Sequence, residues 1–84
     1  MATKVTLNSG TFQYEEGEIK VNGNLSVDGK TINNINGKVE GLGSFDAYLS
    51  GEGLAFNLRP VSIDKAAALA EAVQAAVAAV EGQL

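Results

Sequence analysis

The segment Thr11–Val21, with the sequence TFQYEEGEIKV, places apolar side chains at alternate positions on either side of a Glu-Gly pair. Alternation with a period of two is typical of a strand with one buried face, and a glycine-containing pair between two such runs is typical of a hairpin turn. With Glu16 and Gly17 as the loop, Tyr14 lies opposite Ile19 on the apolar side. The segment therefore predicts an antiparallel hairpin with one buried face.

The same alternation continues in both directions over residues 1–60, broken at short intervals by glycine-containing pairs. On the N-terminal side, a loop at 9–10 sets Val5 opposite Tyr14 on the apolar face. Lys4 then lies opposite Glu15 on the polar face. Strands joined by short loops in this way form a meander of neighbouring antiparallel pairs. Further loops are predicted at 16–17, 22–24, 28–29, 40–42 and 52–53.

The middle of the meander requires two irregular features. A three-residue loop at 22–24 is preferred over a two-residue loop because it sets Val21 opposite Leu25 and so matches apolar with apolar. After the next loop, two successive apolar residues stand three positions apart rather than two. A β-bulge near Asn33 and Asn34 would absorb this extra residue.

The last predicted hairpin has its loop at 52–53. This loop sets Leu49 opposite Phe56 on the apolar face and Asp46 opposite Arg59 on the other face, where the two charges attract. The register between residues 32 and 44 follows least directly from the pattern. The remaining predicted pairs are Leu25 with Ile32, Ile35 with Ala47, and Gly37 with Phe45.

A helix is predicted over residues 62–82. Pro60 lacks an amide donor and ends the strands, Ser62 or Asp64 is suited to cap a helix, and Gly82 is suited to end it. Between them, an apolar stripe recurs at helical spacing, and we expect it to pack on the apolar face of the sheet. The stripe consists of Ile63, Leu69, Val73, Val77 and Val80.

The fold class that follows is α+β, with six to seven short antiparallel strands and one C-terminal, amphipathic, alanine-rich helix packed on one face of the sheet. The chain of 84 residues is expected to be one domain, with the meander over 1–60 and the helix over 62–82. An open sheet and a closed barrel both fit this pattern. A β-solenoid of short repeats is disfavoured because the repeats are few and uneven in length.

The composition excludes several classes of function. The chain has no Cys and no His, which removes disulfides, thiolate chemistry and the usual zinc ligands. Its net charge of −4 and its scattered basic residues argue against binding to nucleic acid, which requires clustered Lys and Arg. No segment is apolar enough for a membrane span or a secretory signal, so a cytoplasmic location is expected.

No residues are predicted to be catalytic, to bind a cofactor or to bind a metal. Glu15 and Glu18 would face each other across the loop at 16–17, but an acidic hairpin tip explains them better than a carboxylate pair for glycoside chemistry. In the Asn-rich stretch 22–36 only Asp28 could offer calcium a charged ligand, and the twelve-residue calcium loop with its terminal Glu is missing. With His and Cys absent, the candidates for general acid or base are carboxylates, Lys and Tyr, and the charged residues fall mostly on outward strand positions or in turns, so we do not expect an enzyme.

The alanines of the helix provide the candidate interface. Residues 68, 72, 75 and 79 are spaced as a second stripe, where a helix side facing water would normally carry long charged side chains. Small residues allow another helix to approach closely, although alanine is also the best helix former on a solvent face. The candidate interface residues are Ala68, Ala72, Ala75 and Ala79.

The expected function is a non-catalytic protein-interaction or structural module that associates with itself, through its helix or a sheet edge, or serves as an accessory subunit of a larger assembly. An unstapled chain of this length gains stability by burying a second face against another protein. The alternative is a small carrier that holds an apolar ligand between sheet and helix. No cofactor is expected for either function.

Overall fold

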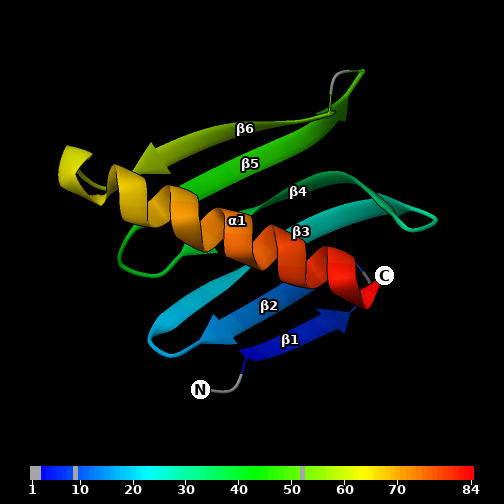
Figure 1. Cartoon of the computed structure of the whole chain (residues 1–84), viewed down its shortest axis with the longest axis horizontal. Helices are drawn as coiled ribbons and strands as arrows, with labels where there is room; N and C mark the ends of the chain where they lie inside the picture. The colour runs from blue at the N-terminus through cyan, green and yellow to red at the C-terminus, as the bar shows by residue number, and fades with distance from the viewer. Residues whose placement is uncertain (1–2, 9, 52) are drawn as a thin grey trace.

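The protein is a two-layer α+β fold, in which one open antiparallel sheet is covered on one face by a single helix (Figure 1). The computed structural model describes residues 3–8, 10–51 and 53–84. The strands follow one another in chain order across the sheet, so that β1 and β6 form its two edges. This confirms the predicted meander, with six strands and an open sheet. The strands are β1 (Thr3–Asn8), β2 (Thr11–Glu16), β3 (Ile19–Asp28), β4 (Thr31–Val39), β5 (Gly43–Ser50) and β6 (Gly53–Pro60).

The helix α1 (Ala66–Gln83) crosses the sheet and contacts all six strands. A short 3₁₀ turn, η1 (Ile63–Lys65), precedes it, so the α-helix begins later than predicted and continues past Gly82. No helix within the described residues is both long and apolar enough to cross a membrane. We call the side of the sheet under α1 the helix face and the opposite side the outer face.

The predicted cap takes a different form. Ser62 has an extended backbone and makes no side-chain hydrogen bond to the start of the helix. Its hydroxyl instead donates a 2.6 Å hydrogen bond to the Asp64 carboxylate. This bond, together with the Asp64 backbone amide, lowers the pKa of Asp64, because both stabilise the ionised form.

The core lies between the helix face and α1, and among the described side chains it contains hydrophobic ones only. Alternate residues of the strands and one side of the helix contribute to it, as the two periodicities predict. From the sheet it contains Phe12, Tyr14, Val21, Ile32, Ile35, Val39, Phe45 and Ala47, and from the helix Leu69, Ala72, Val73, Ala76, Val77 and Val80.

Two of the predicted hairpins and the bulge are confirmed. The first hairpin has the predicted register, with Val5 opposite Tyr14. The hairpin between β4 and β5 sets Gly37 opposite Phe45, as expected from a loop at 40–42. The irregularity between β3 and β4 leaves Asn33 as the extra residue, which is the predicted bulge.

Three predicted registers are wrong, each by two residues. The turn after β2 consists of Gly17 and Glu18, so that Tyr14 lies opposite Val21 rather than Ile19. A turn that begins with glycine needs a positive φ at that residue only, whereas the predicted Glu-Gly turn would also need one at the glutamate. Gly17 has a φ of 61°, and no described non-glycine residue has a positive φ.

The same shift occurs at the other two turns. The turn between β3 and β4 begins with Gly29, which has a φ of 66°, and sets Val27 rather than Leu25 opposite Ile32. Between β5 and β6, Ser50 lies opposite Gly53, so Leu49 faces Leu54 rather than Phe56, and Glu52 of the predicted loop lies outside the described residues. The apolar and polar faces are nevertheless as predicted, because a shift by two residues keeps each side chain on its own face.

The predicted loop at 22–24 does not exist, because β3 runs without interruption through Gly23. Gly23 lies directly opposite Gly37 of β4, and a Cβ atom on either residue would clash with the backbone of the other strand. The two glycines therefore serve a close approach of two strands rather than a turn. Phe12 and Phe45 occupy the neighbouring positions on either side of the glycine pair and are buried in the core.

Candidate functional site

The alanine stripe does not lie on the side of the helix opposite the core. Ala68 and Ala75 are exposed, but Ala72 is only 1% exposed and belongs to the core, and Ala79 is partly buried against it. With about 100° per residue, these four alanines follow one border of the buried arc rather than its opposite side. The sequence placed Ala72 on the wrong side, and only two of the four candidates are open to a partner.

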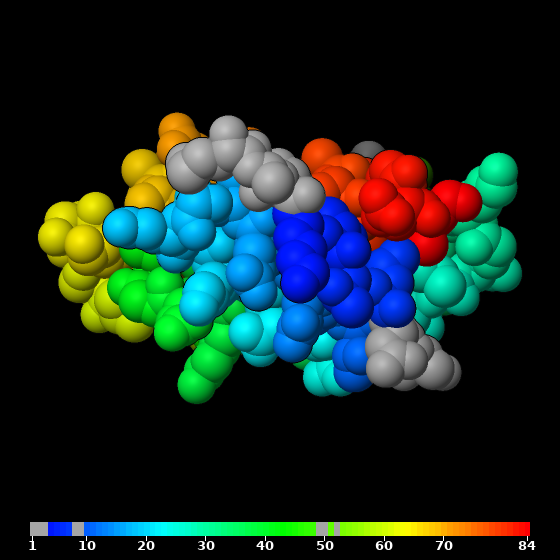
Figure 2. All heavy atoms as spheres, turned by 90° about the horizontal axis from the view of Figure 1, so that it is seen from below, coloured from blue at the N-terminus to red at the C-terminus, as the bar shows by residue number. Residues whose placement is uncertain are grey.

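An apolar surface that the sequence did not single out lies at the β6 edge. Phe56 and Leu58 are 40% and 36% exposed, and Val61 and Ile63 are 67% and 92% exposed. We call these four residues the β6 apolar strip. In Figure 2 the yellow segment that joins β6 to α1 protrudes at one end of the molecule. Ile63 was predicted in the core, but it lies in the 3₁₀ turn before α1 and so does not share the helical stripe.

The register explains why the strand part of this strip is on the helix face. Phe56 lies opposite Ala47, and Leu58 lies opposite Phe45. Ala47 and Phe45 are buried under the helix, and directly opposed residues of an antiparallel pair point to the same side. The helix buries Phe45 and Ala47 of β5, whereas Phe56 and Leu58 of β6 stay partly exposed although α1 also contacts this strand. β6 therefore has the alternation of a strand with one buried face, but two of the side chains on that face, Phe56 and Leu58, are only partly buried.

The backbone of β6 pairs with β5 on one side only, so its other side is a sheet edge. Exposed edges usually carry charges, proline or bulges that prevent pairing with another chain. The one charged residue of β6 is Arg59, which forms a 2.8 Å ion pair with Asp46 of β5. This confirms the predicted ion pair, although Asp46 lies directly opposite Asn57. Pro60 blocks only the end of the strand.

The other edge strand, β1, differs in these respects. It carries Lys4 within the strand, and the Lys4 side chain is exposed. Its apolar residues Val5 and Leu7 are partly buried and pack against the core. The apolar residues of β1 are thus packed against the core, and this strand carries the exposed Lys4. In β6, by contrast, Phe56 and Leu58 are exposed, and the one charged side chain, Arg59, is paired with Asp46. The two edges are not equivalent as surfaces for another chain.

Glu15 and Glu18 do not face each other across the β2–β3 turn. Glu15 lies opposite Lys20, and Glu18 is in the turn, so the imagined Glu15 and Glu18 pair across the hairpin is not formed. Within the described residues, no group of three or more acidic side chains is placed to hold a metal ion. Burial, and the nearby negative charge and hydrogen bond of Glu16, raise the pKa of Tyr14 above its usual value.

A carrier of an apolar ligand would need a void between the sheet and the helix. Three hollows are described, with volumes of about 450, 480 and 490 Å³, and α1 contributes no lining residue to any of them. The first lies on the outer face, and the other two border the turn after β4.

The chain matches no known family model, no curated protein and no solved structure, so no family is assigned to it.

Proposed function

We propose that the chain is a non-catalytic interaction module that associates with itself through the β6 edge and the β6 apolar strip. The observation that carries the proposal is the combination of an unpaired strand edge with four exposed apolar side chains in β6 and the segment that follows it. Either feature alone is common on a protein surface, but together they match the two requirements of strand addition. The backbone supplies hydrogen bonds, and the side chains supply apolar contact.

The proposed complex is a two-fold symmetric dimer, in which β6 of one copy pairs antiparallel with β6 of the other. A two-fold interface uses the same patch on both copies, so Phe56 and Leu58 of one strand lie beside those of its partner. The outer face of each β6 contributes Asn57 and Arg59, and each Arg59 remains paired with Asp46 of its own chain. No unpaired like charges therefore oppose each other across the edge.

The energy available at this surface is consistent with association. Complete burial of one large aliphatic or aromatic side chain stabilises by about 1.5 to 3 kcal/mol, and Ile63 is almost wholly available for burial. An interface of standard size covers about 800 Å² of each partner, which is roughly one sixth of the 5206 Å² surface of this chain. A strand of another sequence, from a larger assembly, would fit the same edge.

The proposal is tested by the mass of the protein in solution. Native mass spectrometry and sedimentation velocity across about 1 to 100 μM should show wild-type protein converting from monomer to dimer as the concentration rises. Phe56→Lys places a charge on the helix face of the edge, which is one way natural edges prevent pairing. Ile63→Lys changes a side chain that is 92% exposed and so alters the surface without entering the core. Both variants should remain monomeric.

The matched control is Val27→Lys. Val27 is 43% exposed, close to the 40% of Phe56, but it belongs to β3 rather than to the edge strand. The Val27→Lys variant should dimerise as the wild type does, and circular dichroism should show that all three variants are folded. A wild-type protein that is monomeric at every concentration, or a dimer that survives both edge variants, would contradict the proposal.

A further inference from the structure

The outer face, which no part of the chain covers within the described residues, has two different halves. In the β4–β6 half, polar side chains bind one another. The Asn36 amide donates to Asn34 at 3.3 Å, the Asn57 amide donates to Asp46 at 3.3 Å, and Arg59 forms its ion pair with Asp46. The hydrogen-bonding capacity of this half is thus partly used within the protein itself.

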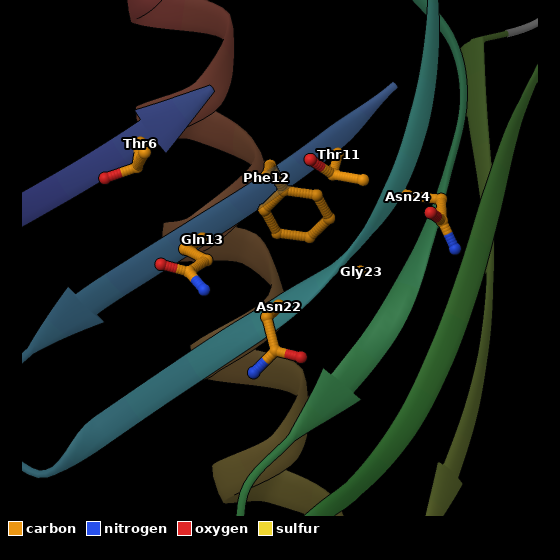
Figure 3. Close-up of a pocket in the computed structure, with 7 residues that line it drawn as sticks. All are labelled: Thr6, Thr11, Phe12, Gln13, Asn22, Gly23 and Asn24. Carbon is orange, nitrogen blue, oxygen red and sulfur yellow. The ribbon is translucent and has the colours of Figure 1, made fainter. Parts of the chain in front are cut away.

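In the β1–β3 half, polar side chains surround a hollow of about 450 Å³ (Figure 3). Thr6, Gln13 and Asn22 form one row across the three strands, and Thr11 and Asn24 form a second row beside it. Phe12 and Gly23 complete the lining. All five polar residues are exposed, and their side chains have no hydrogen-bond partner among the residues that the structure describes.

The lining has a specific chemical character. It contains two hydroxyl groups and three amide groups, each of which can both donate and accept hydrogen bonds, and it contains no charged group. On the same face, exposed Lys38 of β4 lies directly opposite Asn22 but is not among the lining residues, and Glu15 and Lys20 lie opposite each other. The lining residues themselves therefore offer no counter-charge to a phosphate, a carboxylate or a metal ion, and the cation beside them, Lys38, makes inorganic phosphate a necessary comparison in the test.

The lining also offers little to an apolar ligand. Phe12 is 2% exposed, so its ring is part of the core. Among the exposed lining residues, the methyl groups of Thr6 and Thr11 are the apolar groups best suited to contact a ligand. Neighbouring strands are about 5 Å apart, so the hydrogen-bonding groups within each row are also about 5 Å apart. This spacing is similar to the length of one sugar unit in a carbohydrate chain. Alternating hydroxyl and C–H groups on a ligand would match this surface.

We propose that the hollow on β1–β3 binds an uncharged carbohydrate chain, with Gln13, Asn22 and Asn24 bonding its hydroxyl groups and Thr6 and Thr11 contacting its C–H groups. This site is separate from the β6 edge, which lies at the opposite end of the strand order. Binding and self-association are therefore independent, and a dimer through β6 leaves both hollows open.

The test uses the whole, isotope-labelled chain and four uncharged hexasaccharides as probes: maltohexaose, cellohexaose, N-acetylchitohexaose and mannohexaose. At least one should shift the side-chain amide resonances of Gln13, Asn22 and Asn24 in a saturable manner, with a Kd of about 1 mM or below. The side-chain amide resonances of Asn34 and Asn57 should not move. Inorganic phosphate and an uncharged Gly-Ser peptide serve as probes of other chemistry.

Asn22→Ala should weaken binding by about two- to tenfold, which corresponds to the loss of one hydrogen bond. Asn34→Ala removes an exposed amide from the other half of the same face and should leave the Kd unchanged, as should Phe56→Lys. The backbone amide spectrum shows whether each variant is folded. The proposal is overturned if none of the four sugars gives a saturable shift, if Asn22→Ala and Asn34→Ala weaken binding equally, or if only the phosphate or the peptide binds.

Discussion

Gly23 and Gly37 occupy the most constrained positions of the sheet. A Cβ atom at Gly23 would clash with the Asn36 carbonyl oxygen and the Gly37 Cα atom, both of which belong to the β4 backbone. Backbone atoms cannot move aside without opening the pairing of β3 with β4. Gly23→Ala is therefore expected to lower the free energy of unfolding by about 1 to 3 kcal/mol, measured by urea denaturation.

The control for this prediction is Gly82→Ala. Gly82 lies in the last turn of α1, has no positive φ, and has no atom near the position of an added Cβ. Alanine favours the helix over glycine, so this variant should be as stable as the wild type or up to about 1 kcal/mol more stable. If Gly23→Ala unfolds at the same urea concentration as Gly82→Ala, the two strands are not as close as described.

At single residues, the sequence predicted the faces of the strands better than their registers. Tyr14 was correctly assigned to the core, but its partner across the turn was wrong by two residues. A period of two cannot distinguish registers that differ by two, because both keep the same side chains on the same face. The choice between them rests on the positive φ of Gly17, which is a property of one residue.

At the scale of the helix, the two outer alanines and the buried one should respond differently to a charge. Ala72 is 1% exposed among core residues, so Ala72→Glu would place a carboxylate in an apolar interior and should unfold the protein or lower its stability by several kcal/mol. Ala75 is exposed, and Ala75→Glu should change stability by about 0.5 kcal/mol or less. Thermal unfolding followed by circular dichroism measures both. Equal melting temperatures would mean that Ala72 is not in the core.

The β6 apolar strip is an element-scale feature that sequence reasoning missed. Phe56 and Leu58 have the alternation of a strand with one buried face, and this pattern is the same whether or not a helix covers the strand. How far α1 buries Phe56 and Leu58 depends on where the helix crosses the sheet, and no local sequence pattern specifies this position. The exposure of Ile63 was missed for a related reason. Ile63 lies in a 3₁₀ turn, so it does not follow the α-helical spacing from which the apolar stripe was predicted.

For the whole molecule, the two modes of self-association predict different shapes. The monomer has a Cα radius of gyration of 12.1 Å and extents of 36 × 30 × 17 Å. Pairing of two β6 strands would form one sheet of twelve strands, roughly 55 Å across before twist at about 4.8 Å per strand. Packing of two helices through Ala68 and Ala75 would instead stack the copies, thickening the 17 Å direction and leaving the longest extent nearly unchanged.

Small-angle X-ray scattering of the dimer distinguishes these shapes. If β6 forms the interface, the longest dimension should exceed that of the monomer by about half or more, because the sheets join side by side. Phe56→Lys should return the scattering curve to that of the monomer, while Ala75→Glu should leave the dimer curve unchanged. If the dimer is compact and Ala75→Glu dissociates it, the interface is formed by the helix rather than by β6. The hollow on the outer face of β1–β3 would remain accessible in either arrangement.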